Sequence, residues 1–324
     1  MALVSVACAT YNGTRFLPEL LDSILRQDYP QVEVVACDDG SQDGTLEVLG
    51  EYVRRFSRLS VVDNGRRLGY IKNFEKAVSL CSGEYIALCD QDDIWEPRKL
   101  STLVAAIGQN DLVHSDATII DETGAVLDAS YTQAAAKDVT DTSFAKLLLK
   151  NAVTGCTTLF KRQLLTEALP FPAHMPHDHW LAIAASACAG GVVYHGEALT
   201  RYRRHANNAI GAKLRAETAP PYGYGLLSPA RLDDSRAARH ARDYLCYTEV
   251  ARRLLDRLGP RDRRTLNDVI QYHRSYFGSK LRPRALMIHL KYARYFNEGR
   301  SAIGAIRKTL SALFGEVDAT CPNV

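Results

Sequence analysis

Several features that define common protein classes are missing from this 324-residue chain. No run approaches the roughly 18 apolar residues that a membrane-spanning helix needs. The eight cysteines form no C-x-x-C pair, and four of them stand in apolar, strand-like runs: Cys8, Cys37, Cys89 and Cys156. We interpret them as small buried hydrophobes in a reducing cytosol. Internal repeats and low-complexity blocks are also absent.

The short motifs of several well-known sites are missing too. There is no G-x-G-x-x-G after the first predicted strand, no G-x-x-x-x-G-K-[ST] loop, no G-x-S-x-G elbow and no H-E-x-x-H pair. Their absence argues against a dinucleotide site, an NTPase-type phosphate loop and the common hydrolases. The stretch Met1–Val6 has no positive charge before its apolar residues, so we interpret it as a first strand and not as a signal peptide.

The charge is unevenly distributed along the chain. Residues 1–225 hold 21 Lys and Arg against 27 Asp and Glu, whereas residues 226–324 hold 19 against 10. An acidic front and a basic tail predict two segments, a main domain over 1–225 and a basic extension over 226–324. The apolar content of 46% is ordinary for a globular protein.

Short apolar runs alternate with helical patterns over the first 100 residues. Strands are expected at 3–9, 32–37, 59–63 and 84–89, and helices at 15–27, 43–53 and 70–81. This alternation predicts stacked βαβ units and an α/β fold with a parallel sheet. Further along the chain, strands are expected at 111–120, 152–160, 191–195 and 198–203, helices at 142–150 and 178–189, a loop at 129–141 and a linker at 206–230. The tail predicts helices at 231–258, 261–281, 284–297 and 301–314.

Three predicted strands end in polar sequence. The segments that follow them are Thr10–Gly13, Asp38–Ser41 and Asp90–Asp93. Because ligands of an open parallel sheet bind at the carboxyl ends of its strands, these segments are expected to converge. Five carboxylates this close repel one another unless some are protonated or a cation lies among them. Hard oxygen ligands suit Mg²⁺ or Mn²⁺, so the simplest interpretation is a metal–diphosphate site; helix caps or turns are the structural alternative.

The segments Ala9–Gly13, Asp38–Thr45 and Gly83–Trp95 resemble the signature blocks of family-2 glycosyltransferases. The resemblance covers residues 3–210 and implies the GT-A fold, a Rossmann-like, mixed and mainly parallel sheet flanked by helices. Residues 1–110 would bind the nucleotide sugar, residues 111–225 would bind the acceptor, and a helical extension would follow. The nucleotide-sugar site implied by the resemblance consists of Thr10, Tyr11, Asn12, Asp39, Lys72, Asp90, Gln91, Arg203 and Arg204, with Asp92 and His205 at the metal.

The resemblance also implies a role for several of these residues. Asp39 would read a pyrimidine ring, Asp90 would lie near the ribose and Asp92 would contact the metal. Asp93 is either a partner of the metal ligands or a helix cap. Lys72 is either a nucleotide contact or a solvated helix lysine.

Inverting sugar transfer needs a base that takes the proton of the acceptor hydroxyl. The family places this base at the start of a helix, where this chain has Met175–Trp180, and Asp178 is our choice. The structural alternative for Asp178 is a helix N-cap. His177 and His179 are weaker candidates for acceptor or diphosphate contacts, and Trp180 is a sugar platform or a core residue.

The segment Leu199–Asn208 resembles a late family block written Y-R-x-H-x-x-N. In it, His205 would complete the metal shell and Arg203 or Arg204 would hold the diphosphate; a solvated strand edge is the alternative for the arginines. The chain lacks the Q-x-x-R-W pattern of processive synthases, which favours addition of a single sugar. The motif form is most similar to bacterial rhamnosyltransferases of cell-surface polysaccharide assembly, such as that of O-antigen. It implies dTDP-rhamnose as the donor and leaves UDP-hexoses and N-acetylhexosamine donors open.

The partners implied are a nucleoside-diphosphate sugar and a glycan or lipid-linked acceptor. Basic and apolar residues alternate over 280–308, which fits either a peripheral contact with the inner membrane face or packing on the main domain or a second copy. We expect a cytoplasmic protein and no nucleic-acid partner. Two other functions stay open at this point, a sugar-nucleotide nucleotidyltransferase and a non-catalytic binding protein of the same fold.

Overall fold

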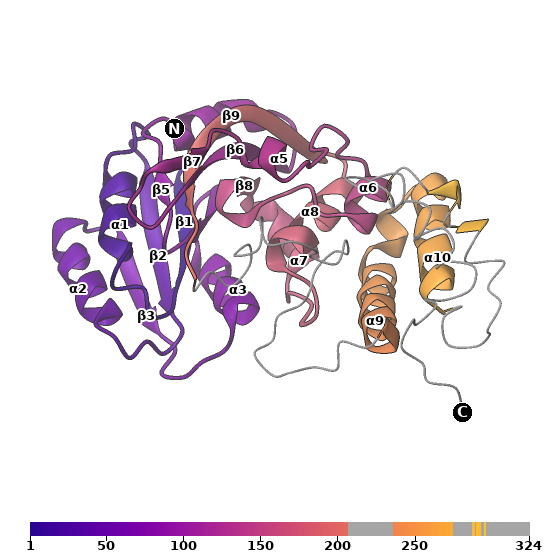
Figure 1. The fold of residues 1–324 in the computed structure, drawn as a ribbon, viewed down its shortest axis with the longest axis horizontal. Helices are drawn as coiled ribbons and strands as arrows, with labels where there is room; N and C mark the ends of the chain where they lie inside the picture. Colours follow the sequence, from indigo (N-terminus) through magenta and orange to yellow (C-terminus); the bar gives the residue numbers. More distant parts are fainter. Residues whose placement is uncertain (207–235, 275–286, 289, 293–294, 296–324) are drawn as a thin grey trace.

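The computed structural model describes residues 1–206 and 236–274, together with residues 287, 288, 290–292 and 295. At its centre is one curved, mixed sheet with helices on both faces (Figure 1). The strand order is β3-β2-β1-β4-β8-β6-β9-β5, and β7 pairs with β6 outside this path. The predicted α/β fold, a mixed sheet flanked by helices, is confirmed.

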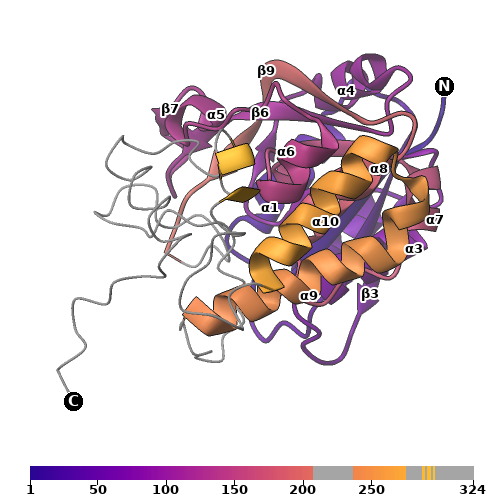
Figure 2. The same ribbon diagram turned by 90° about the vertical axis from the view of Figure 1, so that its right-hand side faces the viewer.

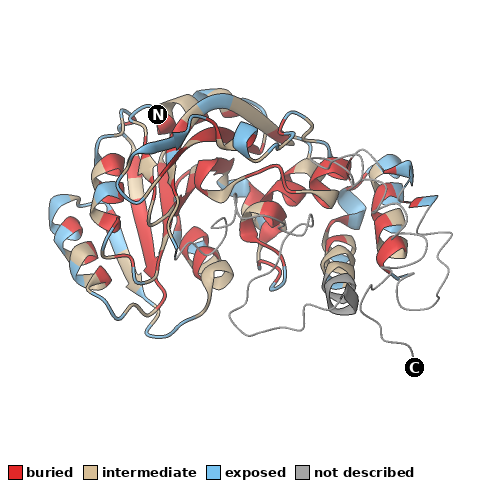
Figure 3. Ribbon diagram, in the orientation of Figure 1, coloured by how far each residue is buried: buried red, intermediate tan, exposed pale blue. Residues whose placement is uncertain are grey.

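The first half of the chain builds the parallel part of the sheet. Its elements are β1 (Val4–Thr10), α1 (Leu17–Leu25), β2 (Val32–Asp38), α2 (Thr45–Arg55), β3 (Leu59–Asp63), α3 (Tyr70–Leu80) and β4 (Tyr85–Asp90). β1 lies between β2 and β4, and the register pairs Thr10 with Asp38 and Ala9 with Asp90. These three strands, buried along most of their length (Figure 3), therefore end at the same edge of the sheet.

The second half adds antiparallel pairs. Its elements are β5 (Ile94–Trp95), α4 (Lys99–Ile107), β6 (Leu112–Ile120), β7 (Val126–Asp128), α5 (Tyr131–Ala134), α6 (Phe144–Leu149), the 3₁₀ turns η1 (Gly155–Thr157) and η2 (Arg162–Leu164), β8 (Thr158–Lys161), α7 (Leu165–Ala168), α8 (His177–Ala187) and β9 (Val192–Arg203). β8 runs antiparallel to both β4 and β6, whereas β9 runs parallel to β6. The two halves thus share one continuous sheet.

Three predictions for this half were wrong. The strand expected at 152–160 begins only at Thr158, because the hydroxyls of Thr157 and Thr158 donate to the carbonyl of Thr154 and curl the chain. The strands expected at 191–195 and 198–203 are one strand, β9, whose pairing with β6 shifts register on either side of Asp116. The loop expected at 129–141 contains α5, which is capped by Ser130.

The tail forms helices that pack on α6 and α8. α9 (Arg236–Leu254), the 3₁₀ turn η3 (Leu255–Arg257) and α10 (Pro260–Arg274) follow in order. α9 and α10 lie side by side (Figure 2), and α10 also contacts α6. Four of their side chains belong to the same buried cluster as the core of α8: Val250, Leu254, Leu266 and Val269.

Some expectations for the tail cannot be followed in the structure. The linker at 206–230 and the helices at 284–297 and 301–314 fall wholly or mostly outside the described residues, as does most of the basic stretch 280–308. The boundary at 225/226 stays a prediction for the same reason. None of the described helices combines the length and the hydropathy that a membrane crossing requires.

Candidate active site

The turn after β2 is held by Asp38, which is fully buried. Its carboxylate accepts hydrogen bonds from the backbone amides of Gly40 and Ser41 and from the hydroxyl of Thr10, the last at 2.8 Å. Thr10 is itself buried and supports this turn. The nucleotide contact predicted for Thr10 stays a prediction, and its hydroxyl is already engaged.

Asp39 is oriented by the loop that precedes α3. Its Oδ1 accepts from the amide of Leu68 at 2.6 Å and its Oδ2 from the amide of Gly69 at 2.9 Å. A carboxylate has about four acceptor positions, so one more donor, such as a ring N–H of a base, can still be accommodated. The predicted role of Asp39 in reading the base is untested by this geometry and compatible with it.

Gln91 joins two of the strand-end segments. Its Oε1 accepts from the amide of Tyr11 at 2.8 Å, and its Nε2 donates to the carbonyl of Tyr11 at 2.9 Å. Gly13 allows this approach, because a Cβ there would lie 2.3 Å from Oε1 of Gln91. Both ends of the Gln91 amide thus hold the Tyr11 backbone, and the predicted nucleotide contact of Gln91 stays a prediction. Asn12, predicted to line the ribose, has φ 49° and accepts from the amide of Gln42.

Lys72 faces a carboxylate of its own helix. Its Nζ donates to both oxygens of Glu75, at 2.8 and 2.9 Å, as an i,i+3 pair. This pair favours the alternative of a surface helix lysine, and the predicted nucleotide contact of Lys72 stays a prediction.

The acidic segment after β4 contains three carboxylates in different surroundings. Asp92 Oδ2 lies 2.8 Å from His205 Nε2, and both side chains are largely buried. Asp93 is fully buried; its Oδ1 accepts from the amide of Arg203, and its Oδ2 has no hydrogen-bond partner among the described residues. Burial and the charges of Asp92 and Asp178 raise the pKa of Asp90 to about 7.

Arg203 was predicted to hold the diphosphate, and the structure places it inside the protein instead. Its fully buried guanidinium donates to the carbonyls of Asp92, Asp121 and Glu122, and it pairs with Glu19 at 2.6 Å. These contacts tie the end of β9 to the acidic segment, so Arg203 stabilises the site without facing a substrate. A diphosphate contact does not fit this placement, because Nε, Nη1 and Nη2 of Arg203 are all engaged within the protein.

The next residue, Arg204, is the second predicted diphosphate ligand. Its backbone amide donates to the carbonyl of Ile120, and no carboxylate within the described residues pairs with its guanidinium. Its Nε is buried without a hydrogen-bond partner in that part of the chain. Of the two arginines, Arg204 is therefore the one whose donors are left for an anionic ligand.

Asp178 lies in the first turn of α8. The N-cap residue of this helix is Pro176, so the alternative of an aspartate N-cap was wrong. Asp178 Oδ1 accepts from the amide of His179 at 2.7 Å, and Oδ2 accepts from Asn151 Nδ2 at 3.3 Å. A carboxylate at this position also benefits from the positive end of the helix dipole.

The other residues of the predicted base motif lie in the protein core. His179 Nε2 is 2.5 Å from the carbonyl of Leu147, and Trp180 Nε1 donates to the carbonyl of Ala168. The contacts considered for His179 and the sugar platform considered for Trp180 are therefore corrected to packing roles. The His177 ring stacks on Phe74 at 4.0 Å, both its nitrogens lack described partners, and burial lowers its pKa to about 4.

The short turn η1 lies between the acidic segment after β4 and Asp178. Cys156 Sγ and carboxylate oxygens of Asp90 and Asp93 all lie within 4.8 Å of one another. A Cβ on the preceding residue, Gly155, would lie 4.0 Å from Asp178 Oδ2. Residues far apart in the sequence thus meet around a single turn, which motif spacing did not reveal.

Lys99 is a second residue that the sequence analysis missed. This fully buried side chain donates from Nζ to the carbonyl of Cys156 at 2.6 Å and lies 3.6 Å from the ring centre of Trp95. Burial lowers its pKa to about 8, while the nearby acidic groups oppose that shift. Its charge partly offsets the repulsion among the carboxylates above it.

The donor set at this edge fits a divalent cation of the Mg²⁺ or Mn²⁺ type. Asp92 and His205 present an oxygen and a nitrogen 2.8 Å apart, and Asp93 keeps a buried oxygen without a partner. Burial raises the pKa of Cys156 well above its usual value, which keeps the thiol protonated and disfavours a thiolate ligand. The three donor atoms that the structure brings together are those of Asp90, Asp93 and Cys156, and Asp92 and His205 stay the predicted cation ligands.

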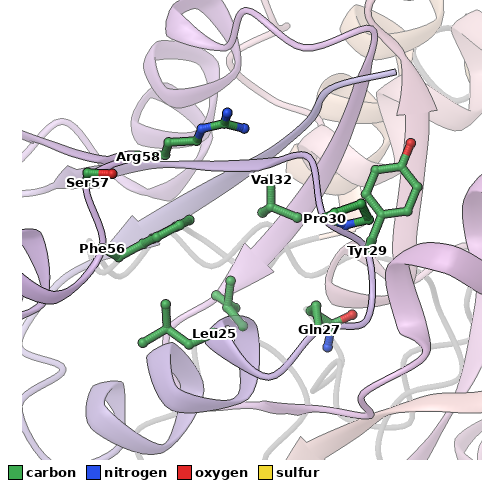
Figure 4. A pocket seen from close by; sticks show the side chains of 9 residues that line it. Leu25, Gln27, Tyr29, Pro30, Val32, Phe56, Ser57 and Arg58 are labelled. Carbon is green, nitrogen blue, oxygen red and sulfur yellow. The ribbon is translucent and has the colours of Figure 1, made fainter. Parts of the chain in front are cut away.

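A separate cavity of about 300 Å³ lies elsewhere (Figure 4). Its lining includes Leu25, Tyr29, Val32 and Phe56. Val32 is the first residue of β2, so this cavity is at the amino ends of the strands, whereas the candidate site is at their carboxyl ends.

Comparisons with known proteins bear on the family and the fold. The sequence model described as Glycosyl transferase family 2 matches residues 5–169. An uncharacterized protein of Mycobacterium tuberculosis is 31% identical over 215 residues, which cover 63% of this chain and 59% of that protein. The putative teichuronic acid biosynthesis glycosyltransferase TuaG of Bacillus subtilis is 28% identical over 218 residues, covering 66% and 84%. The chain thus spans about three fifths of the length of the mycobacterial relative.

Two solved structures share the fold. S. aureus TarS 1–349, crystallised in complex with UDP-GlcNAc, has a TM-score of 0.59 and 17% identity over 96% of this chain and 81% of its own. The mannosyltransferase PcManGT of Pyrobaculum calidifontis, in complex with GDP-Man and Mn²⁺, has a TM-score of 0.51 and 18% identity over 96% and 79%. At these identities the likeness shows the fold alone.

Proposed function

The chain belongs to glycosyl transferase family 2, and from that premise we propose that it transfers a single sugar, with inversion, from a nucleoside-diphosphate sugar to an acceptor hydroxyl. The observation that carries this proposal is the meeting of Asp90 and Asp93 with Asp178 around η1. Donor-side carboxylates and a base in one site are the parts that glycosyl transfer needs.

The donor would lie across the carboxyl ends of β1, β2 and β4. We propose that Asp39 reads the base, Tyr11 and Asn12 line the ribose side, and Asp90 lies near the ribose. The guanidinium of Arg204 would pair with the diphosphate, which is supported by its lack of a described carboxylate partner. Asp92 and His205 would hold Mg²⁺ or Mn²⁺, which when bound neutralises the charge that develops on the leaving diphosphate.

Asp178 would act as the base. As the acceptor oxygen forms its bond to the anomeric carbon and the nucleoside diphosphate departs, a carboxylate oxygen of Asp178 takes the hydroxyl proton. Asn151 and the amide of His179 hold the carboxylate in one orientation, which lowers the entropy lost in reaching the reactive geometry.

The acceptor would approach from the side of α5 and η1. Lys137 Nζ donates to the hydroxyl of Thr154, next to Gly155, and lies over the ring of Tyr131, which in turn contacts Tyr202 at 5.4 Å. Aromatic rings and a cation beside the base suit a sugar acceptor that carries a phosphate, so we propose a glycan or lipid-linked acceptor of cell-surface polysaccharide assembly.

We further propose dTDP-rhamnose as the donor, on the motif form alone, with UDP-hexoses next. We also propose, from the sequence alone, a cytoplasmic location, a contact of the basic tail with the inner membrane face and a homodimer. TuaG, named for teichuronic acid biosynthesis, supports the pathway class only as a relative.

The experiment is a panel of UDP-, GDP- and dTDP-sugars, tested for nucleotide binding and for release of nucleoside diphosphate. Each is measured with Mn²⁺, with Mg²⁺ and with a chelator. Metal-dependent binding and turnover of one donor are expected. A nucleotidyltransferase would instead release pyrophosphate from a nucleoside triphosphate and a sugar phosphate, and a binding protein would show affinity without turnover. If no nucleotide binds in a metal-dependent way, the proposal fails.

A further inference from the structure

Four consecutive backbone carbonyls at the end of α7 find donors outside their own segment. Arg253 on α9 donates to the carbonyls of Glu167, Leu169 and Pro170, at 3.2, 2.7 and 2.5 Å. Trp180 on α8 donates from Nε1 to the remaining one, that of Ala168, at 2.7 Å. The carbonyls that end a helix have no partner within it, so these contacts complete α7.

Arg253 also stacks on the tryptophan that shares this task. Its guanidinium lies 4.7 Å from the ring centre of Trp180, and only 10% of its side chain is exposed. Trp180 is fully buried. A planar guanidinium presents donors in several directions while stacking on a ring, which a lysine ammonium cannot do. The contact therefore depends on arginine and not on positive charge alone.

The same segment touches α8 on both sides of Asp178. Trp180, two residues after Asp178, is bonded to Ala168. His177, one residue before it, stacks with Phe171 at 6.4 Å with an interplanar angle of 22°. The amide of Phe171 donates in turn to Glu75 on α3. Segment 167–171, which we call the 167–171 bracket, thus contacts α8 on both sides of Asp178, and Arg253 holds it through three hydrogen bonds.

We propose that Arg253 is a positioning residue for sugar transfer: through the 167–171 bracket and Trp180, the helical extension orients the first turn of α8 and the carboxylate of Asp178. The proposal rests on the proposed function of Asp178 as base. It gives the extension a part in turnover, beyond covering the acceptor half.

The test compares Arg253→Met with Arg257→Met in the full-length chain. Arg257 is the matched control, because it lies one turn further on, pairs with the Glu167 side chain at 2.6 Å, and is 58% exposed. A misplacement of about 1 Å can cost roughly a hundredfold in rate, so kcat for donor turnover should fall by about ten- to a hundredfold in Arg253→Met. The donor KM should change by less than about twofold, and Arg257→Met should behave like the parent.

Hydrogen–deuterium exchange of peptides covering 174–182 provides a readout that needs no activity. Arg253→Met should speed exchange there and leave the peptides around β1 and β2 unchanged. Arg253→Lys, which keeps the charge, serves if the methionine variant does not fold, and the same local increase is expected. Unchanged exchange at 174–182 in either folded variant, or an equal change in kcat and KM, overturns the proposal. If the parent turns over no nucleotide sugar, the proposed function fails, while the exchange result still decides whether Arg253 orders α8.

Discussion

Replacing the carboxylate of Asp178 by an amide tests the assigned base directly. Asn has nearly the same volume, and its oxygen can still accept from the amide of His179, so α8 should begin as before. The hydrogen-bond partners of Asp178 are Asn151 and the amide of His179, and both lie outside the polar segments that follow β1, β2 and β4. Asp178→Asn should therefore leave the nucleotide site in place.

The electrostatic effect of the change points the same way. Burial is the main cause of the raised pKa of Asp90, and the charge of Asp178 contributes to it after that of Asp92. Removing one negative charge from this site relieves that repulsion, and the variant site repels a diphosphate less than the parent site does. Nucleotide affinity in the presence of Mn²⁺ should stay the same or become slightly tighter.

Turnover should respond very differently. A positioned general base contributes about 10²–10⁴-fold, which corresponds to about 2.7–5.4 kcal/mol of activation free energy. The assay pairs calorimetric titration of the nucleoside diphosphate with kcat at saturating donor. Asn151→Ala, which removes one hydrogen bond to the carboxylate, should lower kcat by only about tenfold. A parallel loss of affinity and turnover in Asp178→Asn, or an unchanged kcat, would refute a base role.

Three further outcomes are expected. Asp92→Ala should weaken Mn²⁺-dependent nucleotide binding at least about tenfold, measured by titration with and without the ion; an unchanged metal response removes Asp92 from the cation site. Gly13→Ala should lower the free energy of unfolding by about 1–3 kcal/mol, because the added Cβ displaces Gln91 from two hydrogen bonds. In a Gln91→Ala background the same change should lower it very little. If denaturant titrations show that the losses of the two single variants add in the double variant, this contact is contradicted. Burial lowers the pKa of His114 to about 3, so the unfolded chain binds an extra proton between pH 6.5 and 3, and stability is lost as the pH falls through that window. His114→Phe should remove about 2 kcal/mol of the stability difference between pH 7 and pH 5, and equal pH slopes for variant and parent would count against the assignment.

The strands and helices of the first hundred residues were predictable because each is a local pattern. Apolar runs such as 32–37 and 84–89 form buried strands, and the helical segments between successive strands allow these strands to pair in parallel. The second half was less predictable. The run 152–160 looks like a strand by composition, yet threonine hydroxyls bonding to the carbonyl of Thr154 curl its start into η1. Side-chain to backbone bonds of this kind have no hydropathy signal.

The candidate site was likewise predictable in part. Asp38, Asp39 and the Asp90–Asp93 segment were placed correctly at one edge, since parallel strands in register must end together. Which polar side chain faces a ligand was not predictable. Arg203 and Arg204 are adjacent and chemically equal, yet Arg203 is buried against three carbonyls, whereas Nε of Arg204 has no hydrogen-bond partner among the described residues.

The sequence by itself determined the family, the order of the strands' polar ends and the residues able to do the chemistry, because these depend on residue type and local spacing. Only the tertiary structure decided which of those residues are already engaged. Gln91 holds a backbone, Lys72 pairs within its helix, and Arg253 donates from α9 to the carbonyl of Leu169 at the end of α7. The sequence gives the hydrogen-bonding capacity of a side chain, but packing sets its partners, which for Arg253 lie more than eighty residues away.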